Sequence, residues 1–322
     1  MATHSPSPLL VKFSHTLWSD AAEREQFIQA LTQPPVYAPC ILWQQSPPTP
    51  PPFETYAPLA WQPAFVQRLK IGIRPGKHPL HDQGAFYCLD FSSIFAASPL
   101  LTLSSPRSLV VDMCAAPGGK SLWVNRVCAP HLLLCNEVIH KRIPSLISNL
   151  KRCQVSSVLV SSLDSQVLAT LLEKTADLVI VDAPCSGQSL LAKGQNAPGC
   201  FHPVTLNKNA NRQKRILANS AQLVAPQGYL AYMTCTYSLA ENEQVCRWFQ
   251  TKFPHFIPQK ISHLLPDQSA YAEFPCYRMW PHKNLGAGGF TILFKNELPG
   301  NYSPSWEYLL DASWIKFKVL PS

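Results

Sequence analysis

With 322 residues, of which 46% are hydrophobic and only 14% are charged, the chain is large enough for one large and one smaller domain and too rich in core-forming residues to be disordered. No charge-free apolar stretch approaches the roughly 20 residues that a membrane helix needs, so we expect no membrane insertion. The net charge of +8 at pH 7 is a mild basic excess, which is compatible with an anionic partner such as nucleic acid but does not require one.

The first part of the chain predicts a small unit of mixed helix and strand. Residues 21–31, AAEREQFIQAL, carry apolar residues at helical spacing, and residues 35–43, PVYAPCILW, indicate a short strand. The run SPPTPPP at 46–52 favours extended polyproline geometry and cannot lie inside a helix or a central strand. We therefore interpret it as a loop or spacer.

These observations divide the chain into three parts. We expect a small N-terminal α+β subdomain over residues 1–78, the main domain over 79–300 and a C-terminal tail over 301–322. The opening residues, MATHSPSPLL, lack the basic and apolar regions of a secretion signal, so we expect a cytoplasmic protein, and we expect it to be a monomer.

From residue 109 onward, β-rich runs alternate with helical ones, which is typical of a mainly parallel sheet covered on both faces. Each run is almost continuously apolar and ends in a polar or special residue. The runs are LVVDM at 109–113, LLLCNEV at 132–138, SVLVSSLD at 157–164, DLVIVDAP at 177–184 and YLAYMTCTYS at 229–238. Ligands of such sheets lie outside the carboxyl ends of the strands. We therefore expect one crevice to bring together Asp112, Glu137, Asp164, Asp182 and Cys235.

The turn after the first of these runs, CAAPGGKS at 114–121, is a candidate ligand loop. The phosphate loop G-x-x-x-x-G-K-[ST] needs Gly at its first position, where this chain has Cys114, so that match fails. Gly118 and Gly119 allow a ligand to approach the backbone closely, and Glu137, roughly 20 residues on, can bind both hydroxyls of a ribose. A nucleoside cofactor therefore fits better than a triphosphate. The alternative is a plain tight turn, with Glu137 at a solvated strand end.

Two further stretches place a cysteine at the rim of the same crevice: DAPCSG at 182–187 and TCTYS at 234–238. A free thiol is only about 3% ionised at neutral pH, so a nucleophilic cysteine needs a helix N-terminus or a cation nearby. Cys185 and Cys235 each precede a predicted helix, and Lys120 is a candidate cation. The alternative to a nucleophilic role is that a cysteine is a small buried hydrophobic residue. We interpret six of the cysteines in this way: Cys40, Cys128, Cys135, Cys153, Cys246 and Cys276. Eleven cysteines, an odd number without a C-x-x-C pair, indicate reduced thiols.

Taken together, DMCAAPGGKS, DAPCSG and TCTYS, in this order and at these separations, resemble the Sun/Fmu (NOL/NOP/Sun) family of RNA cytosine-5 methyltransferases. The resemblance covers roughly residues 80–295. It implies an α/β fold, a Rossmann-like class I methyltransferase domain with a seven-stranded, mainly parallel sheet whose last two strands form a reversed hairpin at 274–280 and 289–296. It also implies that the N-terminal unit is similar to the family's RNA-binding-type subdomain.

The resemblance implies S-adenosylmethionine as the cofactor, RNA (ribosomal or transfer) as the partner and no metal. In the family's chemistry a thiolate adds to carbon 6 of cytosine so that carbon 5 can take the methyl group. By motif correspondence Cys235 is that nucleophile, Cys185 releases the adduct, Asp182 holds the cytosine and lies near the cofactor, and Lys120 lies at the cofactor and active site. The same correspondence gives a cofactor-binding set of Cys114, Ala115, Ala116, Pro117, Gly118, Gly119, Lys120, Glu137 at the ribose, Asp164 by the adenine, and Asp182. Asp164 could instead cap the helix that follows it.

The chain departs from the family pattern in places. Gln188 and Ser189 follow DAPCSG where Thr-Gly is usual, and Leu89 stands where Gln is usual in the upstream motif GAFYCLDFSS. Thr291 replaces a second Phe near the end of the domain. The replacement of Thr-Gly by Gln188 and Ser189 predicts altered target recognition.

Two basic clusters could bind RNA phosphates without recognising sequence. Lys208, Arg212 and Arg215 lie on nearby faces of a predicted helix, and a second cluster spans residues 140–152. Either cluster could equally be a solvated helix face.

Two other functions remain open. A DNA cytosine-5 methyltransferase has the same chemistry but takes its nucleophile from a Pro-Cys-Gln motif, where this chain has Pro184, Cys185 and Ser186. A catalytically silent RNA-binding or ribosome-assembly factor could keep the fold, although the presence of both cysteines and Asp182 argues against it.

Overall fold

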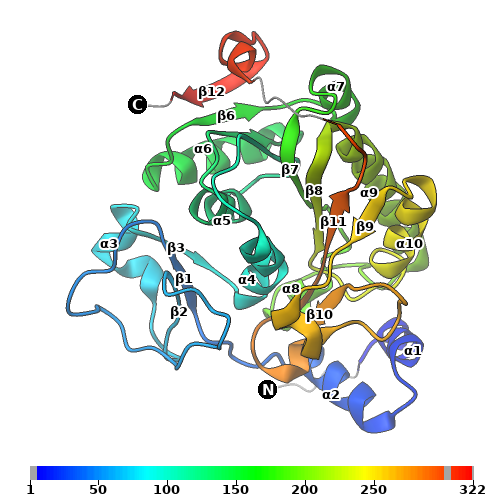
Figure 1. The fold of residues 1–322 in the computed structure, drawn as a ribbon. Helices are drawn as coiled ribbons and strands as arrows, with labels where there is room; N and C mark the ends of the chain where they lie inside the picture. Colours follow the sequence, from blue (N-terminus) through cyan, green and yellow to red (C-terminus); the bar gives the residue numbers. More distant parts are fainter. Residues whose placement is uncertain (1–5, 301–305, 321–322) are drawn as a thin grey trace.

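The computed structural model describes residues 6–300 and 306–320, and a nine-stranded sheet runs through its centre (Figure 1). The strand order is β10-β11-β8-β7-β4-β5-β6-β12, with β9 paired to β11. The strands are β4 (Leu109–Asp112), β5 (Leu132–Asn136), β6 (Val158–Ser161), β7 (Ala176–Asp182), β8 (Val224–Thr234), β9 (Phe256–Pro258), β10 (Tyr277–Met279), β11 (Gly289–Asn296) and β12 (Ile315–Val319).

The pairing confirms the expected α/β fold class. Strands β6, β5, β4, β7 and β8 are mutually parallel, and β11 returns antiparallel to β8 and pairs with β10 as the reversed hairpin. Those seven strands are the expected ones. Two more are added to them: β9 pairs with β11, and β12 pairs antiparallel with β6 at the edge of the sheet.

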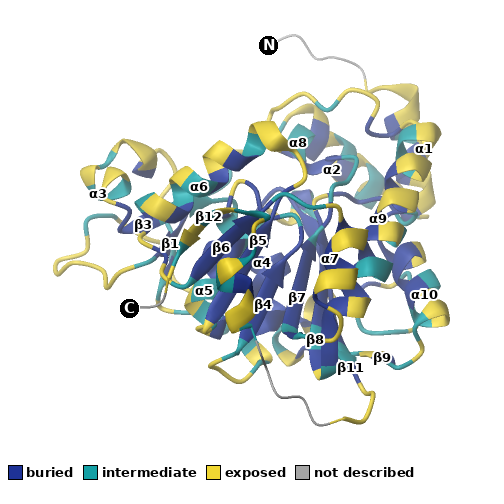
Figure 2. Ribbon diagram, turned by 90° about the horizontal axis from the view of Figure 1, so that it is seen from above, coloured by how far each residue is buried: buried dark blue, intermediate teal, exposed yellow. Residues whose placement is uncertain are grey.

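Helices cover both faces of this sheet because its strands are apolar on both faces. Val110 of β4 packs with α4 (Phe91–Ala97), α5 (Gly119–Cys128) and α6 (Ile143–Arg152), whereas the neighbouring Val111 packs with α7 (Ser165–Leu171), α9 (Pro203–Leu223) and α10 (Glu243–Lys252). Figure 2 shows the buried strands between helices whose outer faces are exposed. Shorter helices are α8 (Ser189–Ala192), η2 (Ser98–Thr102), η3 (His140–Arg142), η4 (Ser262–Asp267) and η5 (Pro281–Lys283).

The N-terminal region forms two separate structures. Strands β1 (Cys40–Trp43), β2 (Val66–Arg68) and β3 (Phe86–Leu89) form a small antiparallel sheet, accompanied by η1 (Pro75–Lys77) and α3 (Pro79–Asp82). Helices α1 (Pro8–Leu17) and α2 (Ala21–Thr32) instead lie beside α8 and η5 of the large domain, away from that sheet (Figure 1). The small sheet thus includes residues beyond the expected boundary at 78. The division into 1–78, 79–300 and 301–322 stays a prediction, and its residues 1–5, 301–305 and 321–322 lie outside the described part.

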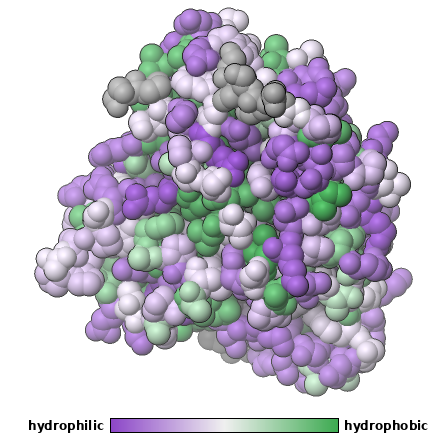
Figure 3. All heavy atoms as spheres, in the orientation of Figure 1, coloured by the Kyte–Doolittle hydropathy of each residue, from purple (hydrophilic) through white to green (hydrophobic). Residues whose placement is uncertain are grey.

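The segment expected as a tail contributes secondary structure. It contains η6 (Glu307–Asp311), whose Leu309 is fully buried against the large sheet's core, and the edge strand β12. In the view of Figure 3 the surface is largely hydrophilic, with hydrophobic residues gathered near its centre. Across the described chain, no helix combines the length and apolar character that crossing a membrane would take.

Candidate active site

The carboxyl ends of the central strands bring together most of the predicted residues. Burial, reinforced by the nearby carboxylates Asp112, Glu137 and Asp182, raises the pKa of the Cys114 thiol well above its ordinary value. Asp182 in turn influences the ionisation of Cys235 at the end of β8. Strands β5, β4, β7 and β8 therefore deliver these side chains to one region, as the parallel topology predicts.

The loop between β4 and α5 is built as the glycine pattern predicts. Gly118 has φ of 111° and caps α5, and a side chain there would be strained and would approach Leu146 to 3.3 Å. Asp112, fully buried beneath the loop, accepts hydrogen bonds from Ser121 Oγ at 2.7 Å and from Cys114 N at 3.3 Å. Burial raises the pKa of Asp112 to about 7, although the hydrogen bond from Ser121 opposes the rise.

Glu137 is buried and is only partly satisfied by protein groups. Its Oε1 accepts a hydrogen bond from Ile139 N at 2.9 Å. Its Oε2 lies 3.0 Å from Arg142 Nη1 as an ion pair but accepts no hydrogen bond of good geometry. The Arg142 guanidinium also donates to the carbonyl of Ala116 in the loop. A buried carboxylate oxygen with unused acceptor capacity suits a ligand hydroxyl, so this site fits a ribose.

Lys120 has a different partner from the expected one. Its Nζ lies 3.2 Å from Asp182 Oδ2, with the lysine side chain 12% exposed and the aspartate side chain 35% exposed. We expected Lys120 as a cation for a thiol, but the pair it makes is with Asp182. Both side chains line a cleft beside the loop.

Cys185 and Cys235 lie side by side. Their sulfur atoms are 3.3 Å apart, within hydrogen-bond distance, and Cys235 is the exposed member of the pair. The hydrogen bond from Cys185 lowers the pKa of Cys235 to about 7 even though burial of the sulfur opposes this, and the positive charge of Lys193 acts in the same direction as the hydrogen bond. The pKa of Cys185 rises well above its ordinary value because of that same hydrogen bond, burial and the negative charge of Glu241. Of the two thiols, Cys235 is therefore the one that ionises at the lower pH.

The helix N-termini expected to activate these thiols do not do so. After Cys235 the next helix, α10, begins only at Glu243, and the helix after Cys185, α8, has four residues. The pKa of Cys235 is lowered first by the Cys185 thiol, and then by the side chain of Ser189 and the positive charge of Lys193. The sequence contained one signal for this arrangement: two cysteines, each following a neighbouring parallel strand at the same edge of the sheet.

Asp164 takes the alternative role left open by the sequence. Its Oδ1 accepts from Gln166 N at 2.9 Å, which caps α7, and its Oδ2 lies 3.5 Å from Arg215 of α9. The loop that carries Asp164 is tied to the end of β5 by Asn136, whose side chain bonds Leu163 N and Leu163 O, both at 2.9 Å. A role beside an adenine stays a prediction.

A cleft of about 390 Å³ opens beside the loop and the Lys120–Asp182 pair. Residues before α4 form its opposite wall, and these were not predicted as site residues. Its lining comprises Tyr87, Cys88, Leu89, Asp90, Ser93, Ala115, Ala116, Pro117, Gly119, Lys120, Asp182, Leu190 and Lys193. Leu89, which departs from the family pattern, thus lies in the wall of the cleft.

The two basic clusters differ in how many of their side chains are exposed and how many bond to other groups of the protein. On α9, Lys208, Arg212 and Arg215 are exposed, although Arg212 donates to Asn209 at 2.6 Å. In the 140–152 cluster the arginines hold the fold together: Arg142 bonds Ala116 and Glu137, and Arg152 bonds the carbonyls of His81 and Phe86. The second cluster therefore offers less free positive charge than its sequence indicates.

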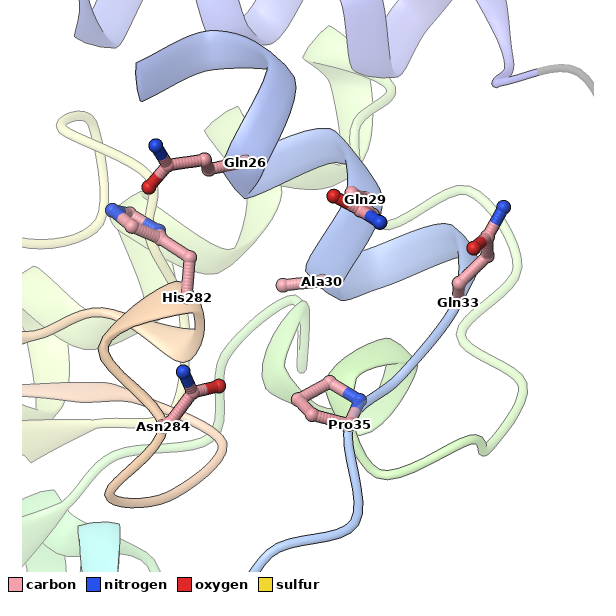
Figure 4. A pocket seen from close by; sticks show the side chains of 7 residues that line it. All are labelled: Gln26, Gln29, Ala30, Gln33, Pro35, His282 and Asn284. Atoms are coloured by element: carbon pink, nitrogen blue, oxygen red, sulfur yellow. The ribbon is translucent and has the colours of Figure 1, made fainter. Parts of the chain in front are cut away.

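A second hollow of about 320 Å³ lies between α2 and η5 (Figure 4). Two glutamines of α2, the glutamine that directly follows this helix and side chains of the η5 loop line it, and it shares no lining residue with the cleft. The lining comprises Gln26, Gln29, Ala30, Gln33, Pro35, His282 and Asn284. Within residues 6–300 and 306–320, no group of three or more His, Cys, Asp or Glu is arranged to hold a metal ion.

Comparison with known sequences gives a consistent result. A family model described as 16S rRNA methyltransferase RsmB/F matches residues 100–295. The chain is 31% identical over 175 residues to ribosomal RNA small subunit methyltransferase F of Pectobacterium carotovorum subsp. carotovorum, covering 54% of this chain and 36% of that protein. The protein of the same name in Escherichia coli K12 is 29% identical over 211 residues, which cover 63% of this chain and 44% of that protein. The chain thus spans less than half the length of these curated relatives.

Solved structures confirm the fold. A methyltransferase homolog protein from Pyrococcus horikoshii superposes with a TM-score of 0.73 at 20% identity, covering 90% of this chain and 95% of that one. The crystal structure of NSun6 from Pyrococcus horikoshii with SFG gives a TM-score of 0.71 at 17% identity, covering 91% of this chain and 99% of that one. At these identities the likeness establishes the shared architecture alone.

Proposed function

The chain belongs to the 16S rRNA methyltransferase RsmB/F family, and from this membership and the paired thiols we propose that it methylates carbon 5 of cytosine in RNA, with S-adenosylmethionine as methyl donor. The observation that carries the proposal is the 3.3 Å contact between Cys185 and Cys235 at the edge of the sheet that also carries the glycine-rich loop and Glu137. A single nucleophile would need one thiol; covalent addition followed by release needs two groups.

The cofactor fits residues at the ends of β4 and β5. The unsatisfied Oε2 of Glu137 would accept a hydrogen bond from a ribose hydroxyl, and Arg142 joins Glu137 to the glycine-rich loop by bonding the carbonyl of Ala116. When bound, S-adenosylmethionine supplies an activated methyl group on a sulfonium centre. Asp164 would contact the cofactor only at its adenine.

The cytosine chemistry is assigned to the two thiols and Asp182. The Cys235 thiolate adds to carbon 6, and the ring electrons make carbon 5 nucleophilic. The Asp182 carboxylate accepts a hydrogen bond from the amino group, or from the ring nitrogen when that nitrogen carries a proton. After methylation Cys185, as a thiolate, takes the carbon 5 proton; the electrons of that C–H bond form the carbon 5–carbon 6 double bond, and the carbon 6–sulfur bond breaks with its electrons returning to Cys235. Cys185, 3.3 Å away, is placed to serve the proton movements of that release.

The target base has to leave its stack to reach Cys235, so cytosines in loops or bulges of RNA are favoured. The family description gives ribosomal RNA as the first substrate to examine, and transfer RNA as a second follows from the wider resemblance.

A methyl-transfer assay tests this proposal. The protein is incubated with S-adenosylmethionine carrying a labelled methyl group and with ribosomal RNA, transfer RNA or duplex DNA, and the digested nucleosides are identified by mass spectrometry. We expect labelled 5-methylcytidine from RNA and none with the Cys235→Ala variant. Label in DNA only would favour a DNA methyltransferase, and RNA binding without label in any nucleoside would favour an RNA-binding or assembly factor.

A further inference from the structure

Gln188 is one of the departures from the family pattern, and the structure places it in the interior. It is fully buried beneath the two cysteine loops. Its Oε1 accepts hydrogen bonds from Thr236 Oγ1 at 2.9 Å and from Tyr237 N at 2.8 Å, and its Nε2 donates to Cys200 O at 3.0 Å. Gln188 comes three residues after Cys185, and its two acceptor contacts are the two residues directly after Cys235.

Glu241 makes the same connection from the other loop. It is fully buried, and its carboxylate accepts from Ser186 N at 2.8 Å and from Ser186 Oγ at 2.6 Å. Gln213 Nε2 of α9 donates to Glu241 Oε2 at 3.0 Å. Glu241 thus lies on the Cys235 loop and holds the residue directly after Cys185.

The hydroxyls of Ser186 and Thr236 close the network, since they lie 2.8 Å apart between Gln188 and Glu241. Ser189 N also donates to the carbonyl of Cys235 at 3.1 Å. The two loops are therefore joined by side-chain and backbone hydrogen bonds in a buried region. A buried polar group that loses its hydrogen bond there would lower the stability of the folded protein. Movement of one cysteine relative to the other requires breaking several of these bonds together.

We propose that Gln188 and Glu241 are positioning residues, which hold the Cys185 sulfur within hydrogen-bond distance of the Cys235 sulfur. An S–H···S contact stabilises a thiolate only while the two sulfur atoms stay within hydrogen-bond distance, and each lies on a loop with no regular structure of its own. The consequence for turnover rests on the proposed function, but the positioning itself can be measured on the protein alone.

The test measures alkylation of Cys235 by iodoacetamide in the absence of RNA and methyl donor. Mass spectrometry of the peptide that contains Cys235 gives its labelling rate between about pH 6 and about pH 9. Gln188→Met keeps an unbranched side chain of similar length but removes all three hydrogen bonds. We expect the labelling midpoint to rise toward the ordinary thiol value near 8.5, so that labelling at pH 7 slows roughly tenfold.

A pair of variants at Thr236 guards against simple loss of packing. Thr236→Val removes the hydroxyl at constant shape and should raise the midpoint, whereas Thr236→Ser retains the hydroxyl and should keep it. Gln62→Met is the matched control, because Gln62 also bonds two backbone groups, Leu59 N at 3.4 Å and Val66 O at 2.7 Å, but does so near the small sheet. Circular dichroism checks that each variant is folded.

The outcomes separate the two proposals. If folded Gln188→Met and Thr236→Val label with the wild-type midpoint, or if Gln62→Met shifts it equally, the positioning role is wrong. If the midpoint shifts as expected while the wild-type protein methylates no RNA, the positioning role stands and the proposed function fails. In an active enzyme, the positioning role predicts a lower kcat with an unchanged KM for RNA.

Discussion

Cys235 should give the activity a distinct pH dependence. Its pKa is lowered to about 7, first of all by the hydrogen bond from Cys185, so the nucleophilic thiolate is already half formed near pH 7. An acid with a lowered pKa ionises at lower pH, so we expect the single-turnover rate to rise about tenfold per pH unit below pH 7 and to level off above it. A rate that keeps rising to about pH 9 would show that Cys235 titrates as an ordinary thiol.

The two thiols should have separable roles on a nucleic acid substrate. With Cys185→Ala, addition at carbon 6 and methyl transfer remain possible but release is blocked, so a covalent protein–RNA adduct should accumulate and survive denaturing electrophoresis. With Cys235→Ala neither adduct nor product should form. Adduct formation by Cys235→Ala but not by Cys185→Ala would reverse the assignment.

Glu137 should contribute directly to cofactor affinity. Its Oε2 is buried without a hydrogen bond, so a ribose hydroxyl would gain a charge-assisted contact. We expect Glu137→Ala to weaken S-adenosylmethionine binding by about 1.5–3 kcal/mol in calorimetric titration. Glu173→Ala, which removes an exposed carboxylate paired with Lys174, is the control and should bind normally. Unchanged affinity in Glu137→Ala would remove this residue from the site.

The sequence predicts the residues that would take part in the reaction better than it predicts the residues that hold them in position. Cys185, Cys235, Asp182 and Glu137 follow from strand ends and motif spacing. Gln188 and Glu241 do not, because their importance lies in contacts between loops 50 or so residues apart in sequence, such as Ser186 N to Glu241.

At the level of elements, α9 is the surface most suited to contact RNA phosphates. Lys208, Arg212 and Arg215 are exposed, although Arg212 bonds Asn209 and Arg215 lies 3.5 Å from Asp164. Arg142 and Arg152 instead bond backbone carbonyls within the fold. Replacing Arg212 and Arg215 by Ala should flatten the dependence of the logarithm of RNA affinity on the logarithm of salt concentration, by about 0.7 for each lost contact with single-stranded RNA.

Filter binding at several salt concentrations measures that slope. Lys252→Ala, which removes an exposed cation from the last turn of α10, is the comparison and should leave the slope as it is. If the double α9 variant has the wild-type slope as well, the α9 face is simply solvated.

Strands buried on both faces were predictable, and an edge strand was not. The five runs from 109 to 238 each contain a strand of the central sheet. A continuous apolar run predicts such a strand because helices cover both faces of a parallel sheet, so its strands need apolar side chains on both sides. Strand β12, IKFKV, alternates between half-buried and exposed residues, and its assignment depends on pairing with β6, about 155 residues earlier in the sequence. Such a short amphipathic run does not reveal its partner, so the sequence predicts only a C-terminal tail there.

The whole molecule has an arrangement that local sequence patterns do not reveal. The sequence predicts one N-terminal unit, but α1 and α2 pack with α8 and the residues around Tyr237 and Trp280, while the small sheet has its own core around Trp43 and Phe86. The cysteine loop after β8 is therefore supported from outside the main domain by the first helices of the chain. The small sheet supplies a wall of the cleft through β3 itself, with Tyr87, Cys88 and Leu89.

This arrangement predicts different effects for two core substitutions. Phe27 of α2 is fully buried, with its ring 5.1 Å from that of Tyr237, two residues after Cys235. Trp43 is fully buried in the small sheet, where its ring lies 5.2 Å from that of Phe86. Replacing either residue by Ala should lower the free energy of unfolding by about 3–5 kcal/mol, measured by urea denaturation.

Only the change at Phe27 should also alter the cysteine pair, because only that ring packs against the loop that carries Cys235. With both variants kept folded at low temperature, we expect alkylation of Cys235 at pH 7 to slow in Phe27→Ala and to match the wild type in Trp43→Ala. Equal slowing in both would mean that Cys235 responds to general destabilisation, and wild-type labelling in both would mean that the cysteine loop is held without the support of α2. The contrast tests whether the first helices of the chain belong functionally with the active site, since each substitution removes a buried aromatic ring from a different core.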